Sequence, residues 1–189
     1  MNFKVSIGNL KLGKDTAIIN ITSSLNCPAK KLNLCKVSQI CYAAKAERLY
    51  KAVLPYRQAQ EKQWESMSAA EIAIGITAIK HKTPIKYLRF SESGDFRNQF
   101  DVWKMSKIAD LLAPAGIKVY GYTARKDLNF DNLSQNMTVN GSGFKVHNSF
   151  TAIPKTQAPS KEEVMCVGNC RNCHKCKERN GLQIVNHYH

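Results

Sequence analysis

Seven cysteines in two groups constrain this chain more than any other feature. The denser group, Cys166, Cys170, Cys173 and Cys176, has the spacing C-x3-C-x2-C-x2-C, so four thiols lie within eleven residues. Overlapping two-residue steps are typical of the short runs that ligate a cuboidal iron–sulfur cluster. A structural zinc site more often pairs two C-x2-C units that stand roughly a dozen residues apart. The spacing favours a [4Fe–4S] cluster, with zinc or metal-free structural thiols as the alternatives.

The second group, Cys27, Cys35 and Cys41, has the spacing C-x7-C-x5-C. Free cysteine is among the most buried residue types, so a role as small core residues is the alternative to metal binding. The surrounding segment 26–36 is polar and turn-rich, which argues against a core position. Three thiols also match a cluster that leaves one iron open to a substrate or cofactor. We therefore predict that all seven cysteines are metal ligands.

Length and composition indicate one soluble α/β domain spanning residues 1–189, without a membrane partner. No apolar run reaches the 18 or so residues that a transmembrane helix needs, and the start of the chain lacks an apolar signal-peptide core. We expect a protein that is not secreted. In a reducing compartment, seven thiols point to metal rather than to disulfides.

The charge is strongly positive, with 28 Lys and Arg against 14 Asp and Glu, a net charge of +14. Such an excess favours an anionic partner, nucleic acid first, and a basic solvated surface without a dedicated partner is the alternative. Part of the charge lies beside the cysteines, where it would offset the negative charge of a thiolate-ligated cluster. These residues are Lys30, Lys31, Lys36, Arg171, Lys175, Lys177 and Arg179.

Hydrophobic periodicity predicts a small, mainly parallel sheet with crossover helices, similar to a partial barrel. Strand patterns cover residues 3–7, 16–21, 85–90, 117–122, 137–140 and 144–148. Helical patterns cover residues 40–67 with a break at Pro55, residues 68–81 with a Ser68–Glu71 capping box, and residues 98–113. Residues 151–161 read as a connector that leads to a cysteine-rich segment, 164–180, packed back on the domain.

Polar loops follow three of the predicted parallel strands, so they should share one rim of the sheet. They carry Cys27, residues 91–95 and residues 123–127. We predict Glu92, Asp95 and Arg125 as catalytic residues that orient a substrate at this rim. The alternatives are capping of the helix that begins at 98, for the two acids, and an ordinary surface charge, for Arg125.

Several motifs resemble the phage gene-product-88 family over roughly residues 20–180, most of the chain. They are Asn26-Cys27-Pro28, Cys41-Tyr42-Ala43 followed by Glu47, Tyr50 and Arg57, the segments 89–96 and 119–125, and the C-terminal cysteines. The resemblance implies a phage protein and hence the cytoplasm of the phage host.

A more distant likeness is to radical S-adenosylmethionine enzymes. They resemble this chain in a partial α/β barrel with three cysteines on the loop after the first strand, where Cys27, Cys35 and Cys41 lie. The expected C-x3-C-x2-C spacing occurs instead at Cys166, Cys170 and Cys173. The likeness implies S-adenosylmethionine as a candidate cofactor.

Three hypotheses follow. The leading one is a protein with one or two [4Fe–4S] clusters and radical or sulfur-transfer chemistry on a nucleic-acid-related substrate. The second is a zinc-stabilised basic nucleic-acid-binding protein without catalysis. The third is an electron-transfer or redox-sensing iron–sulfur protein that docks a redox partner. Whether the chain is an enzyme, and its oligomeric state, stay open at this point.

Overall fold

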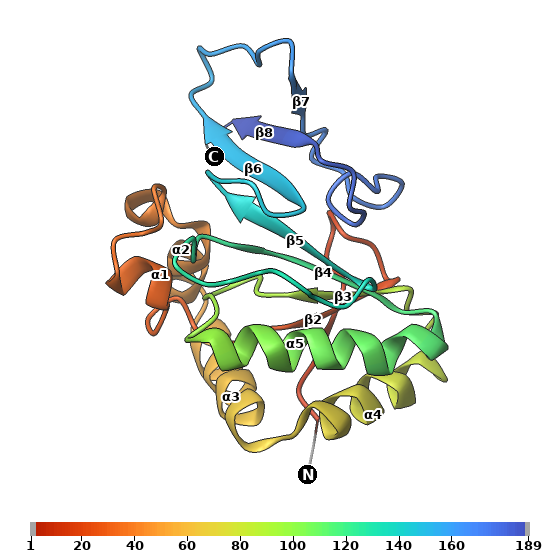
Figure 1. Cartoon of the computed structure of the whole chain (residues 1–189). Helices are drawn as coiled ribbons and strands as arrows, with labels where there is room; N and C mark the ends of the chain where they lie inside the picture. Colours follow the sequence, from red (N-terminus) through yellow and green to blue (C-terminus); the bar gives the residue numbers. More distant parts are fainter. Residues whose placement is uncertain (1–2, 188–189) are drawn as a thin grey trace.

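An open sheet of eight strands forms the centre of the computed structural model, which describes residues 3–187 (Figure 1). The spatial order of the strands is β1-β2-β3-β4-β5-β6-β8-β7. β1 pairs antiparallel with β2, and all other neighbours are parallel. The strands are β1 (Ser6–Ile7), β2 (Thr16–Ile19), β3 (Tyr87–Phe90), β4 (Lys118–Thr123), β5 (Met137–Ser142), β6 (Asn148–Ile153), β7 (Glu163–Met165) and β8 (Gln183–His187). The predicted α/β class and mainly parallel, partial-barrel-like sheet are confirmed, and the sheet does not close.

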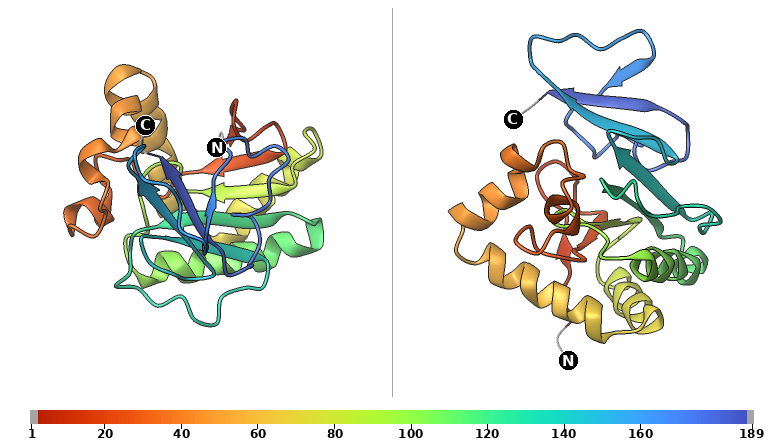
Figure 2. Two further views of the ribbon diagram at one scale, coloured as in Figure 1. Left: turned by 90° about the horizontal axis from the view of Figure 1, so that it is seen from above. Right: turned by 60° about the vertical axis from the view of Figure 1, so that its left-hand side comes forward.

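Three long helices cover one face of β2–β4 (Figures 1 and 2). Two shorter helices lie at the carboxyl ends of the strands, in the segment that follows β2 (Figure 1). The helical elements are α1 (Pro28–Lys31), η1 (Ser38–Ile40), α2 (Tyr42–Leu49), α3 (Val53–Ser66), α4 (Ala69–Lys80), α5 (Gln99–Leu112) and η2 (Ala113–Ala115). The strand–helix–strand unit β3-α5-β4 is the parallel crossover that the sequence predicted.

Alternation along the strands divides the sheet into two faces. Leu88, Phe90 and Val119 belong to the hydrophobic core under the helices. Their neighbours Arg89 and Tyr120, which are register partners on β3 and β4, therefore point to the opposite side. We call this opposite side, on strands β2–β6, the inner face. Gly121 allows the Phe90 ring to pack directly on the backbone of β4, because a Cβ there would lie 2.5 Å from the ring.

Local signals placed most boundaries correctly. Ser68 caps α4, and Glu71 completes the capping box. The predicted helix break at Pro55 is wrong in position, because the helices separate at residues 50–52 and Pro55 lies in the first turn of α3, where its missing N–H costs nothing.

The C-terminal part differs more from the prediction. Residues 144–148 were predicted as a strand, but β6 begins only at Asn148 and continues to Ile153, into the presumed connector. β7 and β8 were not predicted. They exist because each pairs with a distant partner, so neither needs a strong strand pattern of its own. Among residues 3–187, no helix combines the length and the apolar character that crossing a bilayer requires.

Candidate metal centre

The C-terminal cysteine segment is fixed to the inner face by hydrogen bonds to its backbone. Asn140 on β5 donates to the Cys176 carbonyl at 2.9 Å. The Lys177 ammonium donates to the Cys170 carbonyl at 2.9 Å, and the Cys170 amide donates to the Lys11 carbonyl at 2.9 Å. The four cysteines are therefore held against the sheet by its polar inner-face side chains and by the loop after β1.

The thiols of this group lie close enough to act on one another. All seven cysteines of the chain are unpaired and partly buried. Burial raises the pKa of the Cys176 thiol to about 11, and the neighbouring Cys166, Cys170 and Cys173 raise it as well. Burial also raises the pKa of Cys170. Without a bound cation these two thiols stay protonated at neutral pH, so a metal would have to displace their protons.

The N-terminal group lies at the carboxyl edge of the sheet. Cys27 is the N-cap residue of α1. Cys41 is the N-cap residue of α2, which begins two residues after the predicted start of the helical pattern at residue 40. Burial raises the pKa of Cys27 to about 11, with a further contribution from Cys35. Burial raises the pKa of Cys35 too, and Cys41 adds to it. Cys35 thus lies within electrostatic reach of both Cys27 and Cys41 despite their wide spacing in the chain.

A buried ion pair orients the loop that leads to Cys27. The Glu47 carboxylate accepts from the Ser24 amide at 2.9 Å, from the Ser24 hydroxyl, and from the Ser93 hydroxyl at 2.9 Å. Arg57 donates to Glu47 at 3.0 Å, with side-chain exposures of 7% and 6%. Glu47 therefore ties α2 and α3 to the loops after β2 and β3.

A second buried carboxylate supports the same loop. Glu61 accepts from the Ser23 amide at 3.2 Å and from the Asn26 amide group at 3.1 Å. Glu47 and Arg57 were expected only as residues of a family motif, and Glu61 was not expected to have a role. The sequence feature that could have indicated buried charge is the weak amphipathicity of α3. Its buried residues are largely polar: Arg57, Gln60, Glu61, Gln63 and Trp64. A helix that buries charge must receive partners from elsewhere.

The expected common rim of three loops is confirmed by direct hydrogen bonds. The Asp95 amide donates to the Thr22 hydroxyl at 3.0 Å, and the Asp95 carboxylate accepts from the Thr123 hydroxyl at 2.6 Å and the Ala124 amide at 2.8 Å. Burial raises the pKa of Asp95 to about 6. Gly94 permits this close contact, because its φ is +74° and a Cβ would meet Thr22 at 2.0 Å.

Glu92, Asp95 and Arg125 all lie at this rim, but they differ in solvent exposure and in how many hydrogen-bond partners they already have. Arg125 is buried and donates to the Phe96 carbonyl and to the Asp127 carboxylate. Glu92 is more accessible, at 26% side-chain exposure, and lies 3.8 Å from Arg57. Their catalytic role stays a prediction.

The alternative that Glu92 or Asp95 caps the next helix is wrong. The N-cap residue of α5 is Asn98, whose side chain accepts from the Asp101 amide. The alternative of a solvated surface charge for Arg125 is also wrong, since the residue is 4% exposed.

Within residues 3–187, no three His, Cys, Asp or Glu side chains converge as they would around one metal ion. This finding concerns single ions. Ligands of a zinc ion crowd within about 2.3 Å of it, whereas a cuboidal cluster is several atoms wide and holds its thiolates farther apart.

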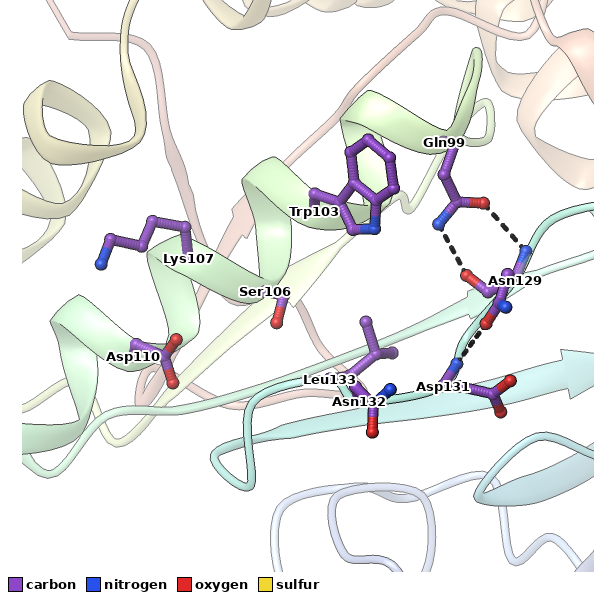
Figure 3. A pocket seen from close by; sticks show the side chains of 9 residues that line it. All are labelled: Gln99, Trp103, Ser106, Lys107, Asp110, Asn129, Asp131, Asn132 and Leu133. Atoms are coloured by element: carbon purple, nitrogen blue, oxygen red, sulfur yellow. Dashed lines mark hydrogen bonds between the residues drawn. The ribbon is translucent and has the colours of Figure 1, made fainter.

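A separate pocket of about 440 Å³ lies between α5 and the segment before β5 (Figure 3). Gln99 and Asn129 close one end through two hydrogen bonds, and Trp103 and Lys107 line the helix side. The pocket contains none of the predicted site residues.

Fold and site together define a mixed α/β protein with an open, mainly parallel sheet and two cysteine groups at its inner face and carboxyl edge. The chain belongs to the gene product 88 family, a family of phage gene products, whose profile matches residues 2–167. The match includes Cys27, Cys35, Cys41 and Cys166 and ends before the other three cysteines. No curated protein and no solved structure matches the chain. The distant likeness to radical S-adenosylmethionine enzymes therefore has no support from these comparisons.

Proposed function

We propose that this chain is an iron–sulfur protein. Cys166, Cys170, Cys173 and Cys176 would hold one [4Fe–4S] cluster. Cys27, Cys35 and Cys41 would hold a second, with one iron left open. The observation that carries the proposal is that each group consists of unpaired, partly buried thiols that act on one another, beside the same sheet.

The donor set fits a cluster in ligand type and in charge. Thiolates are the usual protein ligands of iron–sulfur clusters. The raised pKa values of Cys27 and Cys176 mean that thiolates are costly here unless positive charge accompanies them. Iron supplies part of that charge. Lys177, which is 2% exposed and bonded to the Cys170 carbonyl, supplies more.

A cluster with an open iron supplies a site for electron transfer or for direct binding of a substrate atom. We assign the orienting role at that site to Glu92, because its carboxylate is accessible. Asp95 and Arg125 act through the rim, where they hold the loops after β3 and β4 in place. The net charge of +14 supports a nucleic-acid-related substrate for radical or sulfur-transfer chemistry.

The test is the iron, zinc and acid-labile sulfide content of protein purified without oxygen, with its absorption spectrum. Two clusters correspond to about eight irons and eight sulfides per chain, and one cluster to about four. Cys173→Ser should remove the iron and sulfide of the C-terminal cluster and leave those of the N-terminal cluster. Cys41→Ser should have the opposite effect. Asn172→Ser, an exposed loop position between two ligands, is the matched control and should keep full content.

Zinc without sulfide would overturn the proposal and favour the zinc-stabilised nucleic-acid binder, whose affinity for nucleic acid would fall steeply with salt. A reversible one-electron couple with no spectral response to S-adenosylmethionine would favour the electron-transfer reading. A spectral change on adding S-adenosylmethionine would support radical chemistry at the open iron.

A further inference from the structure

Arg89 is a half-buried cation on the inner face, and no side chain among residues 3–187 pairs with it. Its Nε is fully buried and makes no hydrogen bond within the described part of the chain. Among residues 3–187, Arg89 also forms no ion pair. Arginine keeps its charge at all ordinary pH values, so this half-buried guanidinium carries a charge that no carboxylate among residues 3–187 pairs with. Such a group is costly unless an anion completes it.

The four cations that are buried within residues 3–187 all have acceptors. Arg57 pairs with Glu47, and Arg125 pairs with Asp127. Lys177 donates to the Cys170 carbonyl, and Lys104 donates to the carbonyls of Trp64 and Met67. Arg89, on the third of the eight strands, differs from these four in having no acceptor in the described part of the chain.

The surroundings of Arg89 are polar enough to receive a ligand. Its guanidinium carbon lies 5.2 Å from the centroid of the Tyr122 ring, so the aromatic face orients the fork. The Tyr120 hydroxyl, on the register partner of Arg89, is buried without a hydrogen bond of normal geometry. Two donors on adjacent strands, neither with a hydrogen bond of normal geometry within residues 3–187, therefore share one side of the sheet.

Arg89 lies between the two cysteine groups. Tyr87, two residues before Arg89 on the same face of β3, forms a hydrogen bond at 3.0 Å with His174, which lies between Cys173 and Cys176. Beyond the other end of β3, the hydroxyl of Tyr42, the residue next to Cys41, donates to the Glu92 carbonyl. Arg89 therefore lies on β3 between a contact with each cysteine group. The Glu92 carboxylate already has other partners, because it accepts a hydrogen bond from the Asn9 side chain at 3.0 Å and lies 3.8 Å from the Arg57 guanidinium.

We propose that Arg89 anchors an anion-binding site on the inner face, between the two cysteine groups, which takes the carboxylate or phosphate of a small molecule. A planar guanidinium matches both groups through two parallel hydrogen bonds. The Tyr120 hydroxyl would supply a further donor, and Tyr42 and Tyr122 would line the ligand's other side. The site does not depend on iron and stands apart from the iron–sulfur proposal.

The experiment titrates full-length protein, purified without oxygen, with inorganic phosphate and with malonate by calorimetry at constant ionic strength in chloride. The wild type should bind at least one of them, and the preferred anion tells phosphate from carboxylate. Arg89→Gln should weaken binding at least tenfold. Arg89→Lys keeps the charge without the fork and should give intermediate affinity. Arg48→Gln, on the exposed surface of α2, makes the same charge change and should bind like the wild type.

Iron and sulfide are measured on the same samples. No binding of either anion by the wild type overturns the site, as does wild-type affinity in Arg89→Gln. If Arg89→Gln loses both metal and anion binding, the Arg89→Lys variant separates the two explanations. An Arg89→Lys protein that keeps its iron but binds the anion more weakly supports the site. An Arg89→Lys protein that loses its iron overturns the site and makes Arg89 a counter-charge of the cluster. Absence of iron in the wild type would end the iron–sulfur proposal alone, because the titration does not require it.

Discussion

Replacing Glu47 with alanine removes the carboxylate that joins α2 and α3 to the loops after β2 and β3. Breaking a buried ion pair by deleting one partner costs about 3–5 kcal/mol. Arg57 keeps its hydrogen bond to the Ala43 carbonyl at 3.0 Å and its approach to Glu92 at 3.8 Å. Because Arg57 keeps these contacts, we expect a cost at the lower end of that range, a loss of about 3 kcal/mol in the free energy of unfolding. For a chain of this length, that lowers Tm by about 6–12 °C.

The assay is urea-induced unfolding of the anaerobically purified protein, followed by circular dichroism. Glu162→Ala, at an exposed position, is the matched control and should stay within about 0.5 kcal/mol of the wild type. A Glu47→Ala variant that unfolds at the same urea concentration as this control would refute the reasoning, since it would mean that the ion pair does not hold the two loops.

Acid dependence gives an independent check on the same carboxylate. Burial alone would raise the pKa of Glu47, but donors from Ser24, Ser93 and Arg57 lower it below its ordinary value. A carboxylate with a lowered folded-state pKa stabilises the fold fully above its unfolded pKa, 4.5, and loses this contribution as the pH falls through the folded value. The Glu47→Ala variant should therefore lack one component of the wild type's loss of stability below about pH 4.5.

Three further predictions concern the rim and the thiols. Gly94→Ala should lose at least about 2 kcal/mol of unfolding free energy in urea, because the new methyl meets Thr22 at 2.0 Å. Gly168→Ala has a similar positive φ and nothing within 4 Å, so it should lose only about 1 kcal/mol, and equal losses would contradict the steric argument. Because the Asp95 pKa is raised from 3.8 to about 6, its ionisation disfavours the fold. Wild-type stability relative to Asp95→Asn should fall as the pH rises from about 4 to about 6, and a constant difference would exclude the assigned shift. Anaerobic loading of iron and sulfide, followed by absorbance, should be faster at higher pH because Cys176 must lose its proton from a pKa of about 11, and a rate independent of pH would count against thiol ligation.

Local sequence determined most of the elements in the first 125 residues. The Ser68–Glu71 capping box set the start of α4, since both partners lie within one helical turn. The helix between two apolar strands predicted the crossover β3-α5-β4, because parallel neighbours need such a connection. The shared rim followed from the same rule, and the hydrogen bond of Asp95 with Thr123 confirms it.

Tertiary structure decided what depends on distant partners. β8 pairs with β6 and β7 across long loops, so no local pattern announces it. The buried charges of α3 become acceptable only when the loops after β2 and β3 supply donors, and a single helix pattern cannot show that.

The cysteines and Arg89 make the same distinction clearest. Spacing alone identified two groups of thiols, because ligand spacing is a local property of the chain. That Arg89 lies on β3 between a contact with each group, with its Nε left unpartnered among residues 3–187, is a property of the folded sheet. Burial and the absence of an acceptor are sums over every neighbour in space, and only the fold selects those neighbours.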